Sequence, residues 1–309
     1  MSVLSLKRSE TPRRSRTRQA RMLGYAMLAP AILYIFGLVG APFFLALWYS
    51  VSNVSVTDLH GHFVGLKNFI DLLHDPTFVH AIQVTLIYTF FTTVVVAVLG
   101  TLLAFVLLED FRGKRVLRFF ILLPWTIPIA LTILGWKWMY DSQYSVFNWL
   151  LIHLHLLHGP YGIQWLGRPH VALGAIIAVN IWRNFPFAAI ILLAGLTSIP
   201  SDIIDAAKID GANAWVRLNH VIVPMIFPIL FIGLLFNIVF TMTDLTVVYL
   251  LTQGGPANAT QVMANYAFQV GITSGDLSHG AAITLFLFPA LFILAVIFLR
   301  QLRVKGVEA

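Results

Sequence analysis

The stretch VHAIQVTLIYTFFTTVVVAVLGTLLAFVLL, residues 79–108, contains no Asp, Glu, Lys or Arg. A helix rises about 1.5 Å per residue, so about 20 apolar residues are enough to cross a hydrocarbon core of roughly 30 Å. Lipid offers no hydrogen-bond partners to the backbone, and a helix satisfies its own. This stretch therefore predicts a membrane-spanning helix.

The rest of the chain repeats this pattern. Apolar residues make up 59% of the sequence and charged residues only 11%, with a mean hydropathy of +0.84. Most of the chain must therefore face lipid or other membrane helices. Pro124 and Pro128 fall inside one of the apolar stretches, where a proline tends to kink a helix. Six spans are predicted, at 22–50, 79–108, 117–140, 171–195, 224–251 and 281–299.

The basic residues predict the orientation of these spans. Sixteen of the 20 Lys and Arg residues lie in the N-terminal tail, in the loops after the second and fourth spans, and in the C-terminal tail. Cytoplasmic segments carry the excess of Lys and Arg, so we expect both termini in the cytoplasm. The formal charge of +7 then reflects topology and gives no reason to expect nucleic-acid binding. The predicted parts are a basic cytoplasmic tail (1–21), a six-helix domain (22–300) with a cytoplasmic loop (196–223), and a second tail (301–309).

Several site chemistries find no support in the sequence. Cysteine is absent, which removes disulfides, thiolate metal ligands and cysteine nucleophiles. The sequence contains no GxxxxGK[ST], HExxH or GxSxG motif, so we expect neither a nucleotide site nor a catalytic site in this chain. His153, His155 and His158 suggest a metal site, but offsets of two and five do not share one helix face. We therefore expect no metal and no cofactor bound by this chain.

The loop between the fourth and fifth spans, IPSDIIDAAKIDGANAWVRLNHVIVPMIFP at 199–228, is unusually polar. Pro200 ends the incoming helix, and Ser201 or Asp202 is expected to cap the next one. Gly211 can adopt a positive φ and end that helix. The loop therefore predicts a short helix, a glycine break and a second helix. An amphipathic elbow lying at the membrane surface without a partner is the alternative.

This loop resembles the EAA motif of binding-protein-dependent ABC importer permeases. The matching positions are Asp205, Ala206, Ala207, Gly211, Pro224 and Pro228. In that family the short helix docks in a cleft of the ATPase subunit, which implies that Asp205 pairs with a basic ATPase residue and that Gly211 permits the bend. The sequence departs from the motif at Asp205, where glutamate is usual, and at Leu218, where an aromatic residue is frequent. The coupling residues implied by the resemblance are Asp205, Ala206, Ala207, Asp210 and Gly211.

A second stretch, DLTVVYLLTQGGPANAT at 244–260, resembles the end of span five in carbohydrate importer permeases of the maltose and glycerol-3-phosphate type. Trp182 with 185–187 and the run 193–200 are similar to the same family. Together these likenesses imply an all-α type I ABC importer permease with six transmembrane helices, in the inner membrane of a prokaryote, carrying a sugar or related polyhydroxylated solute. The implied partners are a second homologous permease, two ATPase subunits that bind ATP and Mg, an extracytoplasmic solute-binding protein and membrane lipid.

Polar side chains inside the spans are candidates for function, because burying them in a membrane is costly. At about 1.5 Å per residue, Arg183 lies roughly 18 Å from the outer face and Asp244 roughly 30 Å beyond Pro224. These two residues either pair or line the translocation path. The amides and hydroxyl near mid-depth either bind a hydroxyl-rich solute or join neighbouring helices. The candidate path residues are Asn180, Arg183, Asn184, Asn237, Thr241 and Asp244.

Two other classes of protein compete with an ABC permease. An ion-coupled secondary transporter of a polar solute would need no ATPase, and it predicts inverted repeats and broken, ion-coordinating helices. Neither feature is clear in the sequence. An integral membrane enzyme is the third class, and the missing catalytic motifs give it little support.

Overall fold

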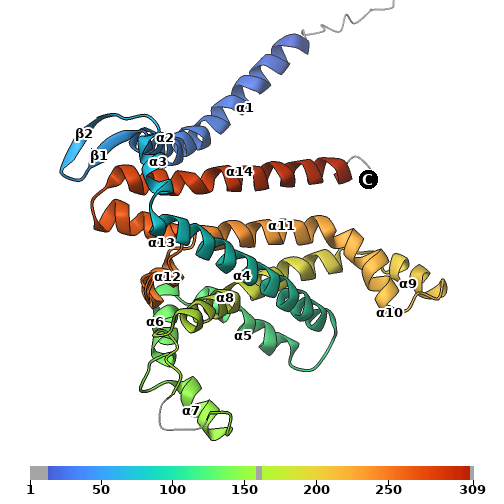
Figure 1. Cartoon of the computed structure of the whole chain (residues 1–309). Coiled ribbons are helices and arrows are strands. Elements are labelled where there is room, and N and C mark those ends of the chain that lie inside the picture. Colours follow the sequence, from blue (N-terminus) through green and yellow to red (C-terminus); the bar gives the residue numbers. More distant parts are fainter. Residues whose placement is uncertain (1–12, 158–161, 307–309) are drawn as a thin grey trace, which may run out of the picture.

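The computed structural model describes residues 13–157 and 162–306 (Figure 1). Nearly all of the regular structure is helical, as expected for this fold class. The exception is an antiparallel hairpin of two short strands in the first loop, which the all-helical prediction did not include. In chain order the elements are α1 Arg13–Ile35, η1 Phe36–Gly40, α2 Ala41–Ser50, β1 Ser52–Ser55, β2 Asp58–Phe63, α3 Lys67–Leu73, α4 Pro76–Leu108, α5 Lys114–Thr126, α6 Ile129–Met139, α7 Val146–His153, α8 Pro169–Thr197, α9 Ser201–Ile209, α10 Ala214–Arg217, η2 Leu218–Ile222, α11 Val223–Met242, α12 Thr246–Leu251, α13 Met263–Phe268, η3 Gln269–Thr273 and α14 Leu277–Gly306.

Five helical stretches within the described residues are long and apolar enough to cross a membrane. They correspond to the first, second, fourth, fifth and sixth predicted spans. Their bounds are Arg21–Ser50, Pro76–Leu108, Pro169–Thr197, Ala214–Met242 and Leu277–Phe298.

The third predicted span, 117–140, is not one straight helix. It consists of α5 and α6, which meet at an angle of 98°. Ile127 is extended at the junction (φ −84°, ψ 137°), and Pro128 follows it. A proline has no N–H to continue the helix and pushes the preceding residue out of the helical region. The chain therefore reaches six spans only if this bent pair counts as one.

The fifth predicted span, 224–251, is also interrupted. Its helix begins earlier, at Ala214, and stops at Met242, and the separate helix α12 follows. The hydroxyl of Thr243 donates to the Val239 carbonyl at 2.8 Å, and the Asp244 carboxylate accepts the Thr246 N–H at 2.9 Å. These local side-chain bonds take the place of the backbone hydrogen bonds of a continuous helix, and a new helix starts after them. The prediction of one continuous helix was wrong here.

The core lies where α4 and α8 pack together, with α11 and α12 against them. At Gly100 of α4 an added Cβ would lie 2.9 Å from the Cβ of Ala188 in α8, so only glycine allows this approach. Small residues commonly bring membrane helices close in this way. Tyr88 and Ile176 are fully buried in the cluster between α4, α8 and α12. The packing fixes the relative depth of the polar side chains on these helices.

The hairpin, α3, α13, η3 and the start of α14 form a compact cap at one end of the molecule (Figure 1). The hydroxyl of Ser278 accepts a hydrogen bond from the backbone of β1 at 2.6 Å. At Gly280 an added Cβ would lie 2.4 Å from the Cα of Gly271, so two backbones touch there. The Tyr266 hydroxyl donates to the Asp75 carboxylate, and burial together with that carboxylate raises the pKa of Tyr266. The elements of this cap contact three spans, through α2, α4 and α14.

Candidate functional site

The loop after α8 forms the predicted elbow of two short helices. Gly211 ends the first helix with φ +78°, and Asn213 caps the second by accepting the N–H of the residue three positions on at 2.9 Å. The helix–glycine–helix prediction is confirmed. The capping prediction was wrong, because Ser201 and Asp202 lie inside α9 and Pro200 occupies the N-cap position without a side-chain hydrogen bond.

The elbow protrudes at the end of the molecule opposite the hairpin (Figure 1). The described chain buries none of the side chains of α9. Asp205 and Ala206 are exposed, Ala207 is half-buried, and the large apolar side chains of Ile209 and Trp215 are 86% and 71% exposed. An uncovered surface of this kind marks a site of contact with a partner or a membrane.

Two charged side chains of α9 pair with each other. Asp205 pairs with Lys208 at 2.8 Å, and both side chains are more than half exposed. An exposed ion pair within one helix contributes little to stability, so another basic group can replace Lys208 at small cost. Asp210 is also exposed, at the C-cap of α9.

A second candidate site is the polar network around the helix break at Asp244. One oxygen of its carboxylate accepts the Thr246 N–H at 2.9 Å and so holds the start of α12. The other oxygen lies 3.8 Å from a guanidinium nitrogen of Arg183 and 3.4 Å from the amide nitrogen of Asn180. The Asp244 side chain is 8% exposed and that of Arg183 is 34% exposed. The structure therefore brings the two predicted charges together, with Arg183 the more accessible one.

The network continues across α8 and α4. The Asn180 amide donates to the Tyr88 hydroxyl, and the Asn184 amide donates to the Asn180 backbone carbonyl at 3.0 Å. On the other side, the indole N–H of Trp125 donates to the Arg183 carbonyl at 2.7 Å, which fastens α5 to α8. Asn180 is fully buried. These contacts make the polar groups a connected unit.

The remaining two predicted path residues lie apart from this network. The Asn237 side chain accepts the Thr93 hydroxyl at 3.0 Å, which links α11 to α4. Thr241 is 1% exposed, and its hydroxyl has no hydrogen-bond partner among the described residues. Sequence reasoning did not find Tyr88, Trp125 or Thr93. Hydroxyl and indole groups inside apolar spans indicate possible hydrogen bonds between helices. The sequence did not show which helices would meet.

Of the three histidines considered for a metal, His153 and His155 lie within the described residues. The ring of His153 bonds the Trp149 carbonyl in its own helix at 2.8 Å, and His158 lies outside the described residues. Over 13–157 and 162–306 no group of three potential His, Asp or Glu ligands comes together.

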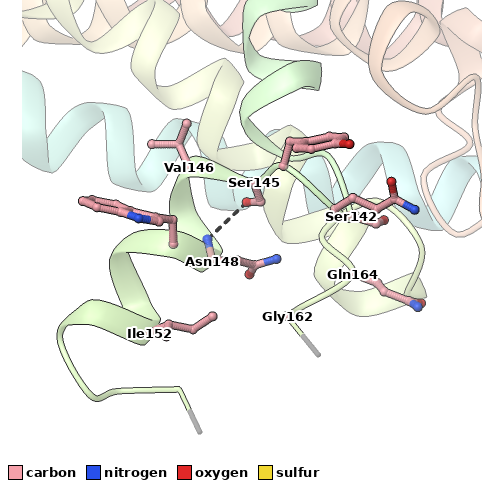
Figure 2. A pocket seen from close by; sticks show the side chains of 10 residues that line it. Ser142, Ser145, Val146, Asn148, Ile152, Gly162 and Gln164 are labelled. Carbon is pink, nitrogen blue, oxygen red and sulfur yellow. Dashed lines mark hydrogen bonds between the residues drawn. The ribbon is translucent and has the colours of Figure 1, made fainter. Parts of the chain in front are cut away.

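A separate pocket of about 770 Å³ lies beside α7 (Figure 2). Within it the Ser145 hydroxyl accepts the Asn148 N–H at 3.2 Å, the bond drawn dashed in Figure 2. The Asn148 side chain accepts the indole N–H of Trp165 at 3.0 Å and so braces the segment between α7 and α8. None of the predicted site residues lines this pocket.

Apolar spans with a polar network inside and an exposed elbow at one end define an integral membrane transport protein, with no catalytic constellation among the predicted residues. Residues 97–308 match the family of binding-protein-dependent transport system inner membrane components. That match covers more than half of the chain, and the chain belongs to this family.

Individual relatives extend the match to nearly the whole chain. The trehalose/maltose transport system permease protein MalF of Thermococcus litoralis is 31% identical over 283 residues, which cover 92% of this chain and 94% of that protein. The trehalose transport system permease protein SugA of Mycobacterium tuberculosis is 31% identical, with 91% and 88% covered. A crystal structure of a bacterial ABC transporter involved in alginate import has a TM-score of 0.79 at 20% identity, covering 94% of this chain and 99% of that one. The last likeness supports the fold.

Family membership decides between the classes that the sequence left open. The chain is a multi-pass inner-membrane permease of a transport system that depends on a binding protein. It supplies a route through the membrane and is not a catalytic enzyme. The secondary transporter and the membrane enzyme are therefore set aside.

Proposed function

We propose that this chain and a second homologous permease together form the path by which an ATP-driven importer moves a sugar or related polyhydroxylated solute. The relatives named above are permeases for trehalose or maltose, which supports this solute class. A further relative, from Agrobacterium fabrum, is a sulfoquinovosyl glycerol permease with 29% identity. All three solutes carry many hydroxyl groups, and amide and guanidinium groups inside the spans suit such solutes.

The observation that carries this proposal is that the described chain buries none of the side chains of α9, in the protruding elbow. We assign Asp205, Ala206, Ala207, Asp210 and Gly211 to contact with an ATPase subunit. The small alanines allow close approach, and the exposed carboxylates offer partners to basic residues. Each permease presents one such helix, so two permeases take two ATPase subunits. Those subunits bind ATP and Mg, and this chain needs no cofactor of its own.

For the path itself we assign the polar residues of the spans to the solute. Arg183 is the most accessible of them, and its contact with Asp244 at 3.8 Å is long enough for a hydroxyl group to compete. Asn237 is bonded to a neighbouring helix, so it becomes available only when α4 and α11 shift. The assigned path residues are Asn180, Arg183, Asn184, Asn237, Thr241 and Asp244.

Transport then follows from motion at the two ends of the molecule. A solute-binding protein docks at the hairpin end, and closure of the ATPase subunits moves α9 at the other end. Because α8 leads directly into the elbow, movement of α9 acts on the helix that carries Arg183. We place the elbow and both termini in the cytoplasm, in agreement with the distribution of basic residues.

The orientation can be tested directly because the chain has no cysteine. Ile209→Cys places a thiol on the elbow, and Leu59→Cys places one on the hairpin, at side chains that are 86% and 63% exposed. In intact cells a membrane-impermeant maleimide should label the hairpin cysteine and leave the elbow cysteine unlabelled until the membrane is opened. The reverse labelling pattern would refute the proposed orientation.

The coupling assignment is tested with two charge reversals on the same helix. The complete transporter is reconstituted in proteoliposomes, and solute uptake and ATP hydrolysis are measured together. Asp205→Lys should reduce uptake per ATP at least tenfold, because it puts a cation where a basic ATPase group is expected. Asp202→Lys, an equally exposed acid in the first turn of α9, is the matched control and should retain uptake. Normal uptake by Asp205→Lys at normal assembly would exclude the assignment.

A further inference from the structure

A groove of about 410 Å³ lies between α5 and α8, close to the elbow. Its volume falls within the range of ligand pockets, roughly 300–1,000 Å³. The α5 wall includes Arg118 and Leu122, and the α8 wall includes Leu193 and Ala194. The lining residues recur at helical spacing along α5 and along α8, so each wall is one continuous helix face. Apart from Arg118 and a threonine at the end of α8, the lining is apolar.

Contacts between α5 and α8 close one end of the groove. Near the bend after α5, the ring of Trp125 stacks on Phe187 at 4.7 Å and its N–H bonds the Arg183 carbonyl at 2.7 Å. Arg118 lies seven residues earlier, about 10 Å along the helix. There the two helices are separated by the groove. The result is a wedge that is closed near the middle of α8 and open towards the end that leads into the elbow.

Residues 109–118 contain four basic and two acidic side chains, so the mouth of the groove carries a net positive charge. Arg118 is exposed and makes no hydrogen bond or ion pair within the described part of the chain. Of the two acids, Asp110 is held by Lys114 at 2.9 Å, and that hydrogen bond is the main cause of its lowered pKa, which the more distant charge of Arg118 lowers further. Arg115 is also exposed, and the first turn of α5 contains no acidic residue. An anion near this mouth therefore meets several basic groups.

We propose that this groove binds an anionic phospholipid, with its phosphate at Arg118 and one acyl chain along Leu122, Leu193 and Ala194. The groove has apolar walls and one guanidinium group at its mouth. A phospholipid matches this arrangement, because its acyl chain is apolar and its headgroup carries a phosphate. A sugar would leave its hydroxyls unpaired against these walls. Basic clusters on the cytoplasmic side of membrane helices meet the leaflet that holds anionic lipid. Because α8 ends at the groove and continues into α9, the lipid braces the helix that carries the elbow.

The test is a lipid titration of the purified full chain in a neutral detergent. Bound lipid is counted by native mass spectrometry with dioctanoyl phosphatidylglycerol and, separately, dioctanoyl phosphatidylcholine. Phosphatidylglycerol should bind more tightly to the unmodified chain. Arg118→Gln should weaken it about fivefold, the effect of losing one basic contact at a membrane surface. Arg112→Gln, on the same loop but outside the groove, is the charge-matched control and should change binding less than twofold. Ala194→Phe fills the groove and should weaken both lipids.

Several results would overturn the proposal. Equal affinity for the two lipids would show that the positive charge at the groove does not select an anionic headgroup. Equal loss in Arg118→Gln and Arg112→Gln would indicate diffuse attraction with no defined site. If Ala194→Phe left lipid binding intact but blocked assembly with the second permease, the groove would be a subunit interface. The titration needs no ATPase and no solute, so its failure would leave the proposed transport function untouched. Thermal unfolding is measured for each variant as a control for retention of the fold.

Discussion

The contact between Arg183 and Asp244 makes a quantitative prediction about the interior of the membrane domain. At 3.8 Å, opposite unit charges attract by about 4 kcal/mol at an effective dielectric of 20. Arg183 is 34% exposed, and screening reduces the expected net coupling to about 1–2 kcal/mol. Asp244→Asn removes the charge but keeps an oxygen that can accept the Thr246 N–H. Asp244→Ala also loses this cap, which contributes about 1 kcal/mol more.

A double-mutant cycle separates the charge from the cap. Unfolding of the purified chain in mixed micelles, titrated with SDS, gives the free energy for each variant. Asp244→Asn should destabilise the chain by about 1–2 kcal/mol when Arg183 is present. With Arg183→Gln in place, the same substitution should be neutral or stabilising, because it removes a buried charge that has lost its partner. Equal destabilisation in both backgrounds would refute the pairing and leave Asp244 as a helix cap alone.

Two further predictions concern helix packing. Gly280→Ala should destabilise the chain by about 1–3 kcal/mol, because its Cβ would lie 2.4 Å from the backbone of η3. Gly174→Ala, with no atom within 4 Å of the new Cβ, is its control and should be neutral or slightly stabilising in thermal unfolding. Thr93→Val should cost about 1–3 kcal/mol, since it leaves the buried Asn237 oxygen unbonded. Thr101→Val, which loses only a bond to its own helix, should cost less in the same assay, and an equal cost would argue against the link between helices.

The elbow was readable from the sequence because its determinants are local. Gly211 was expected to adopt a positive φ, and it does so at +78°. Pro200 and the polar residues after it separate two apolar spans. Helix-breaking residues of this kind affect the structure only within a few residues. The error at Ser201 and Asp202 was also local, since the helix begins one residue earlier than a cap at Ser201 requires and two residues earlier than a cap at Asp202 requires.

The two broken spans show where this reasoning failed. Pro128 predicted a kink, but a proline alone does not indicate an angle as large as 98°. The direction of a broken helix depends on what receives it, here the packing of α6 against α12 and α8. The interruption before α12 is due to Asp244, whose carboxylate finds backbone donors, Asn180 and Arg183 within reach. Residues 241–246, TMTDLT, are polar but short, and their flanks are apolar, so a hydropathy average over a whole span did not show the break.

By itself, the sequence determined that the chain crosses a membrane as helices and that a polar elbow joins two of them. Both properties follow from composition and from residues close together in the chain, because lipid forces each helix to satisfy its own backbone. Only the tertiary structure decided which polar side chains meet. Tyr88, Asn180 and Asp244 lie on three different elements, and their contacts depend on close packing such as that at Gly100. The separation of Asn237 from this network has the same origin, because helix depth and rotation are set by neighbours distant in the sequence.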